Sequence, residues 1–118
     1  ASGRLSPVKG FEYLIKGMPG VLNKYPKAYL YILGEGREEN KLLELSNKLG
    51  LGHRTKLLKN IPLASFLKSI DIFCLPSLEE PLGLSVLEAQ YFGIPCVVSN
   101  IGGLRVLVEN ENTGLLVP

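Results

Sequence analysis

Two glutamates, Glu80 and Glu88, lie on either side of a glycine, Gly83, where an apolar run gives way to a helical pattern. The apolar residues 72–75 predict a buried strand, and residues 83–92 predict the helix that follows it. Because glycine has no side chain, a ligand can approach the backbone closely at Gly83. The free N–H groups and positive dipole end of the helix would attract an anion such as phosphate, and Glu88 would accept hydrogen bonds from hydroxyl groups. The segment therefore predicts a site for a phosphorylated, hydroxyl-rich ligand.

The rest of the chain is expected to alternate between strands and helices. Apolar runs predict strands at 29–33, 55–59, 72–75, 96–99 and 115–117, and helical periodicity predicts helices at 42–49, 63–70, 83–92 and 104–108. A helical pattern also begins at Phe11, but Gly17 and Pro19 interrupt it, so a broken helix is expected there.

This alternation predicts an α/β fold with three layers, a Rossmann-like parallel sheet with helices on both faces and right-handed crossovers. In such sheets ligands bind beyond the carboxyl ends of the strands. The loops of this kind are those at Arg4, Gly34, Glu80 and Gly102.

The composition limits the class of protein. The chain has 118 residues, of which 46% are hydrophobic and 20% charged, so residues 1–118 are expected to form a single globular domain. A net charge of +2 is too small for a nucleic-acid-binding surface. No apolar segment approaches the roughly 18 residues of a membrane span, so a cytoplasmic location is the default. Cys74 and Cys96 lie in apolar runs and are interpreted as buried thiols rather than as a disulfide or a zinc site.

Several short motifs lead to a known family. They are Gly3-Arg4-Leu5 followed by Lys9-Gly10, then Leu33-Gly34-Glu35-Gly36, Glu80-Pro81-Leu82-Gly83-Leu84 with Glu88, Gly102-Gly103, and Thr113-Gly114-Leu115-Leu116-Val117-Pro118. The chain resembles the C-terminal domain of the retaining glycosyltransferases of group 1, which have the two-domain GT-B architecture. In that family two glutamates separated by seven residues surround a Glu-Pro-Phe-Gly-Leu stretch, a spacing that Glu80 and Glu88 meet.

The resemblance implies a role for each matching residue. Arg4 and Lys9 would hold the diphosphate of a nucleoside-diphosphate sugar, Glu80 would lie near the donor sugar, and Glu88 would accept hydrogen bonds from the ribose. The remaining donor-binding positions that it implies are Gly34, Gly36, Leu82, Gly83, Leu84, Gly102 and Gly103. It also implies hexosyl transfer with retention and no cofactor or metal ion, because the basic pair and the helix terminus supply the charge stabilisation.

Other interpretations of these residues stay open. Arg4 and Lys9 would otherwise be solvated surface cations, and Glu80 and Glu88 a helix-terminus charge and an exposed helical residue. Gly34-Glu35-Gly36 is not a dinucleotide fingerprint, because Glu39 stands where that fingerprint has its third glycine.

The sequence also departs from the family pattern at three positions. Leu82 replaces a phenylalanine, Lys59 a glycine that borders the base, and Val106 a glutamate.

The resemblance implies that the chain is a fragment of a two-domain enzyme, cytoplasmic or peripheral to the membrane, whose acceptor-binding N-terminal domain is missing. The family has an apolar strand immediately before Gly3, so we expect a first strand truncated to residues 2–5, with a weakened sheet or self-association through exposed edges. The isolated domain would lack activity. Two further hypotheses are a non-catalytic nucleotide or sugar-nucleotide binding module and a nonfunctional folding fragment.

Overall fold

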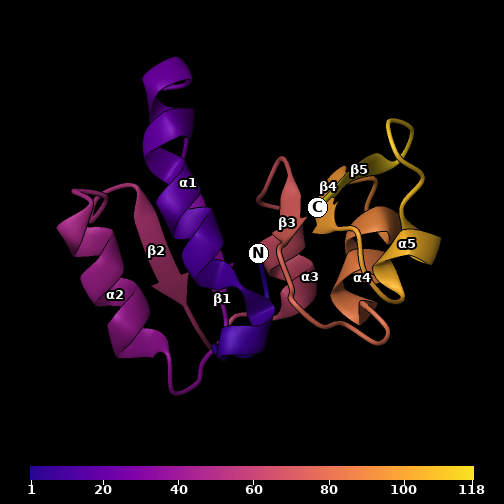
Figure 1. The fold of residues 1–118 in the computed structure, drawn as a ribbon, viewed down its shortest axis with the longest axis horizontal. Helices are drawn as coiled ribbons and strands as arrows, with labels where there is room; N and C mark the ends of the chain where they lie inside the picture. The colour runs from indigo at the N-terminus through magenta and orange to yellow at the C-terminus, as the bar shows by residue number, and fades with distance from the viewer.

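The computed structural model describes residues 1–118, in which helices and parallel strands alternate (Figure 1). A 3₁₀ helix comes first, and the helices cover both faces of the strands, as expected. The elements are η1 (Pro7–Lys9), α1 (Phe11–Lys24), β1 (Leu30–Leu33), α2 (Glu39–Lys48), β2 (Thr55–Leu58), α3 (Leu63–Leu67), β3 (Phe73–Leu75), α4 (Leu84–Tyr91), β4 (Cys96–Ser99), α5 (Leu104–Leu107) and β5 (Gly114–Val117). No helix has the length and apolar character needed to cross a membrane.

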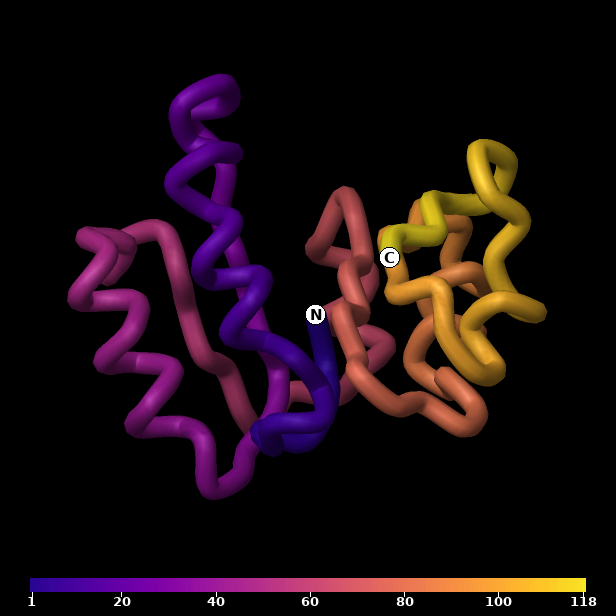
Figure 2. Tube along the Cα trace, viewed as in Figure 1, coloured from indigo at the N-terminus to yellow at the C-terminus, as the bar shows by residue number.

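The strands form two parallel sheets, so the weakening that was expected at the truncated first strand is a complete division. β1 pairs with β2, and β3, β4 and β5 form a second sheet in that order. The tube in Figure 2 shows the N-terminus between these two groups of strands. Since β1 and β3 are not paired with each other, the sheet is divided at the place where the first strand of a doubly wound order would lie.

Residues 1–5 occupy part of this division. Ser2 forms a single parallel bridge with Leu33, in which the Leu33 N–H donates to the Ala1 carbonyl at 2.9 Å and the Gly3 N–H to the Leu33 carbonyl at 3.0 Å. Leu5 follows, fully buried, and its N–H donates to the carbonyl of Glu35. The expected truncated first strand is therefore present as a bridge along one edge of β1.

An apolar groove of about 560 Å³ continues the division beyond Ala1. Its walls include Leu30 and Tyr31 of β1 and Cys74 of β3. Burial lowers the pKa of the Ala1 amine from 8.0 to about 6, although the amine donates a hydrogen bond to the Tyr31 carbonyl at 3.0 Å. Burial at this end of the groove therefore disfavours the charged form of the amine.

Helix α1 is continuous from Phe11 to Lys24, so the prediction of a broken helix was wrong. Pro19 lies inside the helix and is exposed to solvent. The apolar residues on either side of it, Ile15, Met18 and Leu22, recur at spacings of three and four residues and belong to one hydrophobic core. Packing of this single face holds the helix together despite the hydrogen bond that proline cannot donate.

One hydrophobic core joins the two sheets. It includes Phe11 and Ile32 from the first half of the chain and Phe73 and Val98 from the second. Because the strands are parallel, their carboxyl ends lie on the same side of the molecule, and the loops after β1, β3 and β4 are brought together there.

Two close backbone approaches position η1 against the loop after β3. The Leu78 N–H donates to the Val8 carbonyl at 2.7 Å. Gly10 adopts a left-handed conformation (φ 66°), and a Cβ there would lie 2.2 Å from the Pro76 carbonyl oxygen. Glycine is therefore required at position 10, and the contact places Lys9 beside the loop that carries Glu80.

Candidate functional site

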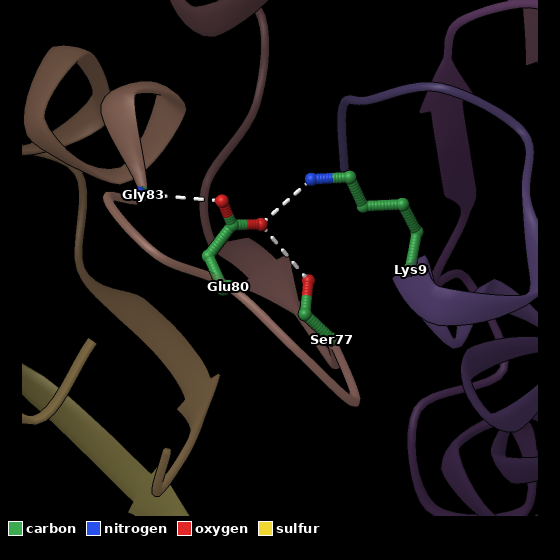
Figure 3. A network of polar contacts seen from close by, with 4 residues as sticks. All are labelled: Lys9, Ser77, Glu80 and Gly83. Atoms are coloured by element: carbon green, nitrogen blue, oxygen red, sulfur yellow. Dashed lines mark hydrogen bonds and ion pairs between the residues drawn. The ribbon is translucent and has the colours of Figure 1, made fainter. Parts of the chain in front are cut away.

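An ion pair between Lys9 and Glu80 forms the centre of the candidate site (Figure 3). The Lys9 ammonium donates to Glu80 Oε2 at 2.7 Å across a sequence separation of 71 residues. The side chains of Lys9 and Glu80 are only 23% and 11% exposed. The pair is thus partly withdrawn from water, where a charge-assisted hydrogen bond is stronger than at an open surface.

Two further groups hold the Glu80 carboxylate. The hydroxyl of Ser77 donates to Oε2 at 3.3 Å, and the backbone N–H of Gly83 donates to Oε1 at 3.3 Å (Figure 3). Both oxygens therefore point at groups of the protein, and the carboxylate has a defined orientation.

The N-terminus of α4 lies beside this carboxylate. Gly83 is its N-cap residue in a left-handed conformation (φ 72°, ψ 43°), and the N–H groups of Val86 and Leu87 donate to the Gly83 carbonyl. The N–H groups of Leu84 and Ser85 have no acceptor within the protein. They are free N–H donors at the helix end where the sequence predicts an anion site.

The glycines near α4 allow segments of the chain to approach one another. A Cβ at Gly83 would lie 2.6 Å from Leu104 Cδ2, and Cβ atoms at Gly102 and Gly103 would lie 2.5 Å and 2.4 Å from the carbonyl oxygens of Glu80 and Pro81. The Gly103 N–H also donates to the Glu80 carbonyl at 3.3 Å. The paired glycines therefore fix the loop of Glu80 against the loop after β4.

An open cleft of about 520 Å³ lies over these groups. Its lining residues are Val8, Lys9, Leu78, Glu79, Glu80, Pro81, Ile101 and Gly102. Three of the predicted site residues, Lys9, Glu80 and Gly102, thus face one cavity, and Gly83 and Gly103 adjoin it through their backbone contacts.

The other predicted residues have different surroundings. Arg4 and Glu88 are exposed and form no ion pair, so their side chains are available to a ligand. Leu82 and Leu84 are 65% and 62% exposed on either side of Gly83.

The Gly34 and Gly36 pair has a structural reason for lacking side chains. A Cβ at Gly34 would collide with the Gly3 carbonyl oxygen, and one at Gly36 would lie 2.5 Å from the Leu5 carbonyl oxygen. These two glycines admit residues 3–5 to the end of β1.

Two of the departures from the family pattern also have defined surroundings. Lys59 forms an ion pair with Glu39 at 2.9 Å, and the hydrogen bond and charge of Glu39 raise the pKa of Lys59. Val106 on α5 is 84% exposed. No group of three or more His, Cys, Asp or Glu side chains is arranged to hold a metal ion.

Ser77 is the site residue that the sequence analysis missed. Its side chain is only 1% exposed, yet it carries a hydroxyl directed at Glu80. The one available signal was its spacing, three residues before Glu80 in a loop that follows a buried strand.

Comparison with known proteins identifies relatives of the whole chain. The model of the family described as glycosyl transferases group 1 matches residues 1–118. An uncharacterised glycosyltransferase of Methanocaldococcus jannaschii is 39% identical over 118 residues, which cover 98% of this chain and 30% of the relative. The UDP-Gal:alpha-D-GlcNAc-diphosphoundecaprenol alpha-1,3-galactosyltransferase of Escherichia coli is 39% identical over 121 residues, covering 98% of this chain and 31% of that protein.

Solved structures share the fold. The pneumococcal O-GlcNAc transferase GtfA, in complex with UDP and GlcNAc, superposes with a TM-score of 0.94 at 23% identity over 99% of this chain and 23% of that chain. Anabaena HepE, in complex with UDP and glucose, gives 0.88 at 28% identity over 98% of this chain and 33% of that chain. Sucrose-phosphate synthase from Thermosynechococcus elongatus gives 0.89 at 32% identity, covering 98% of this chain and 31% of that chain.

The 118 residues thus span about a third or less of the length of the relatives that they match. Family model, relatives and fold agree over the whole chain: it belongs to the group 1 family of glycosyl transferases and has the Rossmann-like fold of a GT-B glycosyltransferase domain.

Proposed function

We propose that this chain is the donor-binding domain of a retaining glycosyltransferase, which transfers a hexosyl unit from a nucleoside-diphosphate sugar to an acceptor hydroxyl. The observation that carries the proposal is the Lys9–Glu80 pair, held in an open cleft beside unpaired N–H groups at the start of α4. A cation, a carboxylate and backbone donors at one place suit a ligand that has both phosphate and hydroxyl groups.

Each side chain has a distinct role in this proposal. The Arg4 guanidinium and the Lys9 ammonium bind the diphosphate and stabilise its charge as it leaves, without a metal ion. Glu80 accepts a hydrogen bond from a hydroxyl of the sugar, and Glu88 accepts hydrogen bonds from the ribose hydroxyls. UDP is the first nucleotide to test, because UDP is named for both GtfA and HepE and a UDP-sugar for the Escherichia coli relative.

The proposal assigns the acceptor site to a further domain, because the relatives are about three times as long as this chain. The isolated 118 residues then bind donor without transferring sugar. A cytoplasmic enzyme, or one at the cytoplasmic membrane surface, agrees with the two free cysteines, since a reducing compartment keeps thiols unpaired.

Calorimetric titration of the 118-residue chain with UDP, GDP and ADP tests the proposal. We expect saturable binding of one of the three, and no binding of any would contradict a donor-binding domain. Sugar transfer by the isolated chain would contradict the assignment of the acceptor site. Binding without transfer by the complete protein would support the alternative of a non-catalytic module.

The variant Glu88→Gln tests the ribose contact. A hydrogen bond to a charged group contributes about 1.5–3 kcal/mol, so loss of the charge should weaken nucleotide binding by about tenfold or more. Glu44→Gln is the matched control, because Glu44 is also an exposed helical glutamate without an ion pair. Equal nucleotide affinities of Glu88→Gln and Glu44→Gln would contradict a contact between Glu88 and the ribose.

The variant Arg4→Gln tests the diphosphate contact. Arg4 is exposed and unpaired, so its neutralisation should leave the fold intact and weaken binding of UDP far more than binding of uridine. Lys48→Gln, at the exposed end of α2, controls for the change in net charge. The same loss for both ligands would contradict the phosphate assignment.

A further inference from the structure

Ser77 directs a buried hydroxyl at the carboxylate of the candidate site. Ser77 is only 1% exposed, and its hydroxyl donates a hydrogen bond to Glu80 Oε2 at 3.3 Å. A buried hydroxyl is costly unless it is hydrogen-bonded, so the bond to Glu80 satisfies Ser77 and orients Glu80 at once. By contrast, the buried hydroxyls of Ser46 and Thr55 have no hydrogen-bond partner.

The hydrogen bonds of the carboxylate divide into two kinds. Oε2 accepts from the Lys9 ammonium and from Ser77, and Oε1 accepts from the Gly83 N–H (Figure 3). Lys9 is a long, flexible side chain, whereas Ser77 and the Gly83 backbone are short and fixed by burial. Each oxygen has about two acceptor positions, so one position on Oε1 stays free for a ligand hydroxyl.

The Lys9 ammonium carries a single positive charge, which Glu80 and a donor diphosphate would have to share. A donor diphosphate in the cleft competes for the ammonium, and a Glu80 held by Lys9 alone would then be free to rotate. The Ser77 hydroxyl and the Gly83 N–H bind the carboxylate independently of Lys9, so they would still hold it if the ammonium turned toward a ligand.

We propose that Ser77 is a positioning residue, which keeps the Glu80 carboxylate aimed into the cleft while Lys9 exchanges this carboxylate for a phosphate of the donor. The inference rests on the proposed function, since it takes the ligand to be a nucleoside-diphosphate sugar. It predicts that Ser77 matters most when Lys9 is not paired with Glu80.

Hydrogen exchange of the Gly83 amide tests this without any ligand. The amide is bound by Glu80 Oε1, so its protection reports how well the carboxylate is held. In Ser77→Ala the exchange of the Gly83 amide should accelerate modestly. In the double variant Lys9→Met/Ser77→Ala it should be about tenfold or more faster than in Lys9→Met alone. Ser77→Thr retains the hydroxyl and should restore protection. The Val98 amide in β4 serves as the reference for global stability, because this strand lies in the core.

Titration with UDP and UDP-glucose gives the second measurement. Ser77→Ala should leave the affinity for UDP within about twofold and weaken UDP-glucose by about fivefold or more, since only the sugar contacts Glu80 in this scheme. Equal losses for the two ligands, or unchanged Gly83 exchange in the Lys9→Met background, would overturn the role of Ser77. If the parent chain binds neither ligand, the proposed function fails, and the Gly83 exchange alone decides whether Ser77 positions Glu80.

Discussion

The substitution Gly103→Ala should displace the loop that carries Glu80, because it adds a Cβ atom where the chain is closely packed. Gly103 has an ordinary helical backbone conformation (φ −66°, ψ −19°), so alanine fits the backbone itself. The added Cβ, however, would lie 2.4 Å from the Pro81 carbonyl oxygen, and the obstacle is backbone that cannot rotate away. The loop that carries Glu80 must therefore move by roughly 1 Å to reach normal van der Waals separation.

The expected loss of stability follows from two opposing effects. Forcing an extra carbon into a packed contact costs about 1–3 kcal/mol, while alanine reduces the entropy of the unfolded chain by the equivalent of about 0.4–1 kcal/mol. The free energy of unfolding should fall by about 0.5–2 kcal/mol. With an unfolding entropy of about 2.1 cal/mol/K per residue, this corresponds to a decrease in Tm of roughly 2–8 °C for the 118-residue chain.

Gly17→Ala is the matched control. Gly17 lies inside α1, and a Cβ there meets nothing within 4 Å. Alanine should raise the free energy of unfolding by about 0.5–1 kcal/mol, because it favours the helix. Thermal unfolding followed by circular dichroism measures both variants, and the amide shift of Gly83 in NMR spectra shows whether the Glu80 loop has moved. A Tm for Gly103→Ala at or above that of the parent chain would refute the packing argument.

Three further predictions concern the fold. Pro19→Ala should raise the free energy of unfolding by about 1–3 kcal/mol, because it restores a hydrogen bond inside the continuous helix α1, and an unchanged Tm would mean that the helix gains nothing there. An apolar segment of about five or six residues joined before Ala1 should fill the groove beside β1, raise the Tm and favour a monomer, whereas a Gly-Ser segment of equal length should do neither. Burial lowers the pKa of the Ala1 amine to about 6, so between pH 6 and 8 the unfolded chain binds more protons than the folded chain. The free energy of unfolding should therefore rise with pH in this range by up to about 3 kcal/mol. Urea titrations measure this dependence, and acetylation of the amine should abolish it. Above pH 9 the sign reverses for Cys96, whose pKa burial raises to about 11, because the unfolded chain then loses that proton first.

The order and type of the elements could be predicted because they depend on local pattern. Apolar runs located every strand to within two residues at each end, as in β1 (Leu30–Leu33), whose apolar run spans residues 28–33, and β4 (Cys96–Ser99), predicted at 96–99. Pro19 misled the same reasoning, since the periodicity of the buried residues on both sides of it outweighs its local effect. The division into two sheets was expected only as a weakness at residues 2–5, because hydrogen bonding between strands distant in sequence leaves no mark on local composition.

The sequence indicated which residues surround the candidate site but not the contacts between them. The local spacing of Glu80 and Gly83 indicated a carboxylate beside a helix end, and the N–H of Gly83 does bind Glu80. The ion pair with Lys9 joins residues 71 positions apart, so it follows from the fold alone. Ser77 was overlooked because a serine in a loop is ordinarily solvated, and its burial depends on packing of the whole domain.

The glycines near the candidate site have a structural role that the sequence did not indicate. Gly34 and Gly102 were expected to bind the donor because of the family resemblance, and in the structure the backbone of the chain itself approaches them closely. Gly34 admits Gly3 to the end of β1, Gly10 admits Pro76 after β3, and Gly102 admits the Glu80 carbonyl beside the loop after β4. These three contacts connect the carboxyl ends of strands from both sheets, which share no strand-to-strand hydrogen bonds. The contacts at Gly10 and Gly102 act on the segments that carry Lys9 and Glu80, so a side chain at either glycine should displace the Lys9–Glu80 pair.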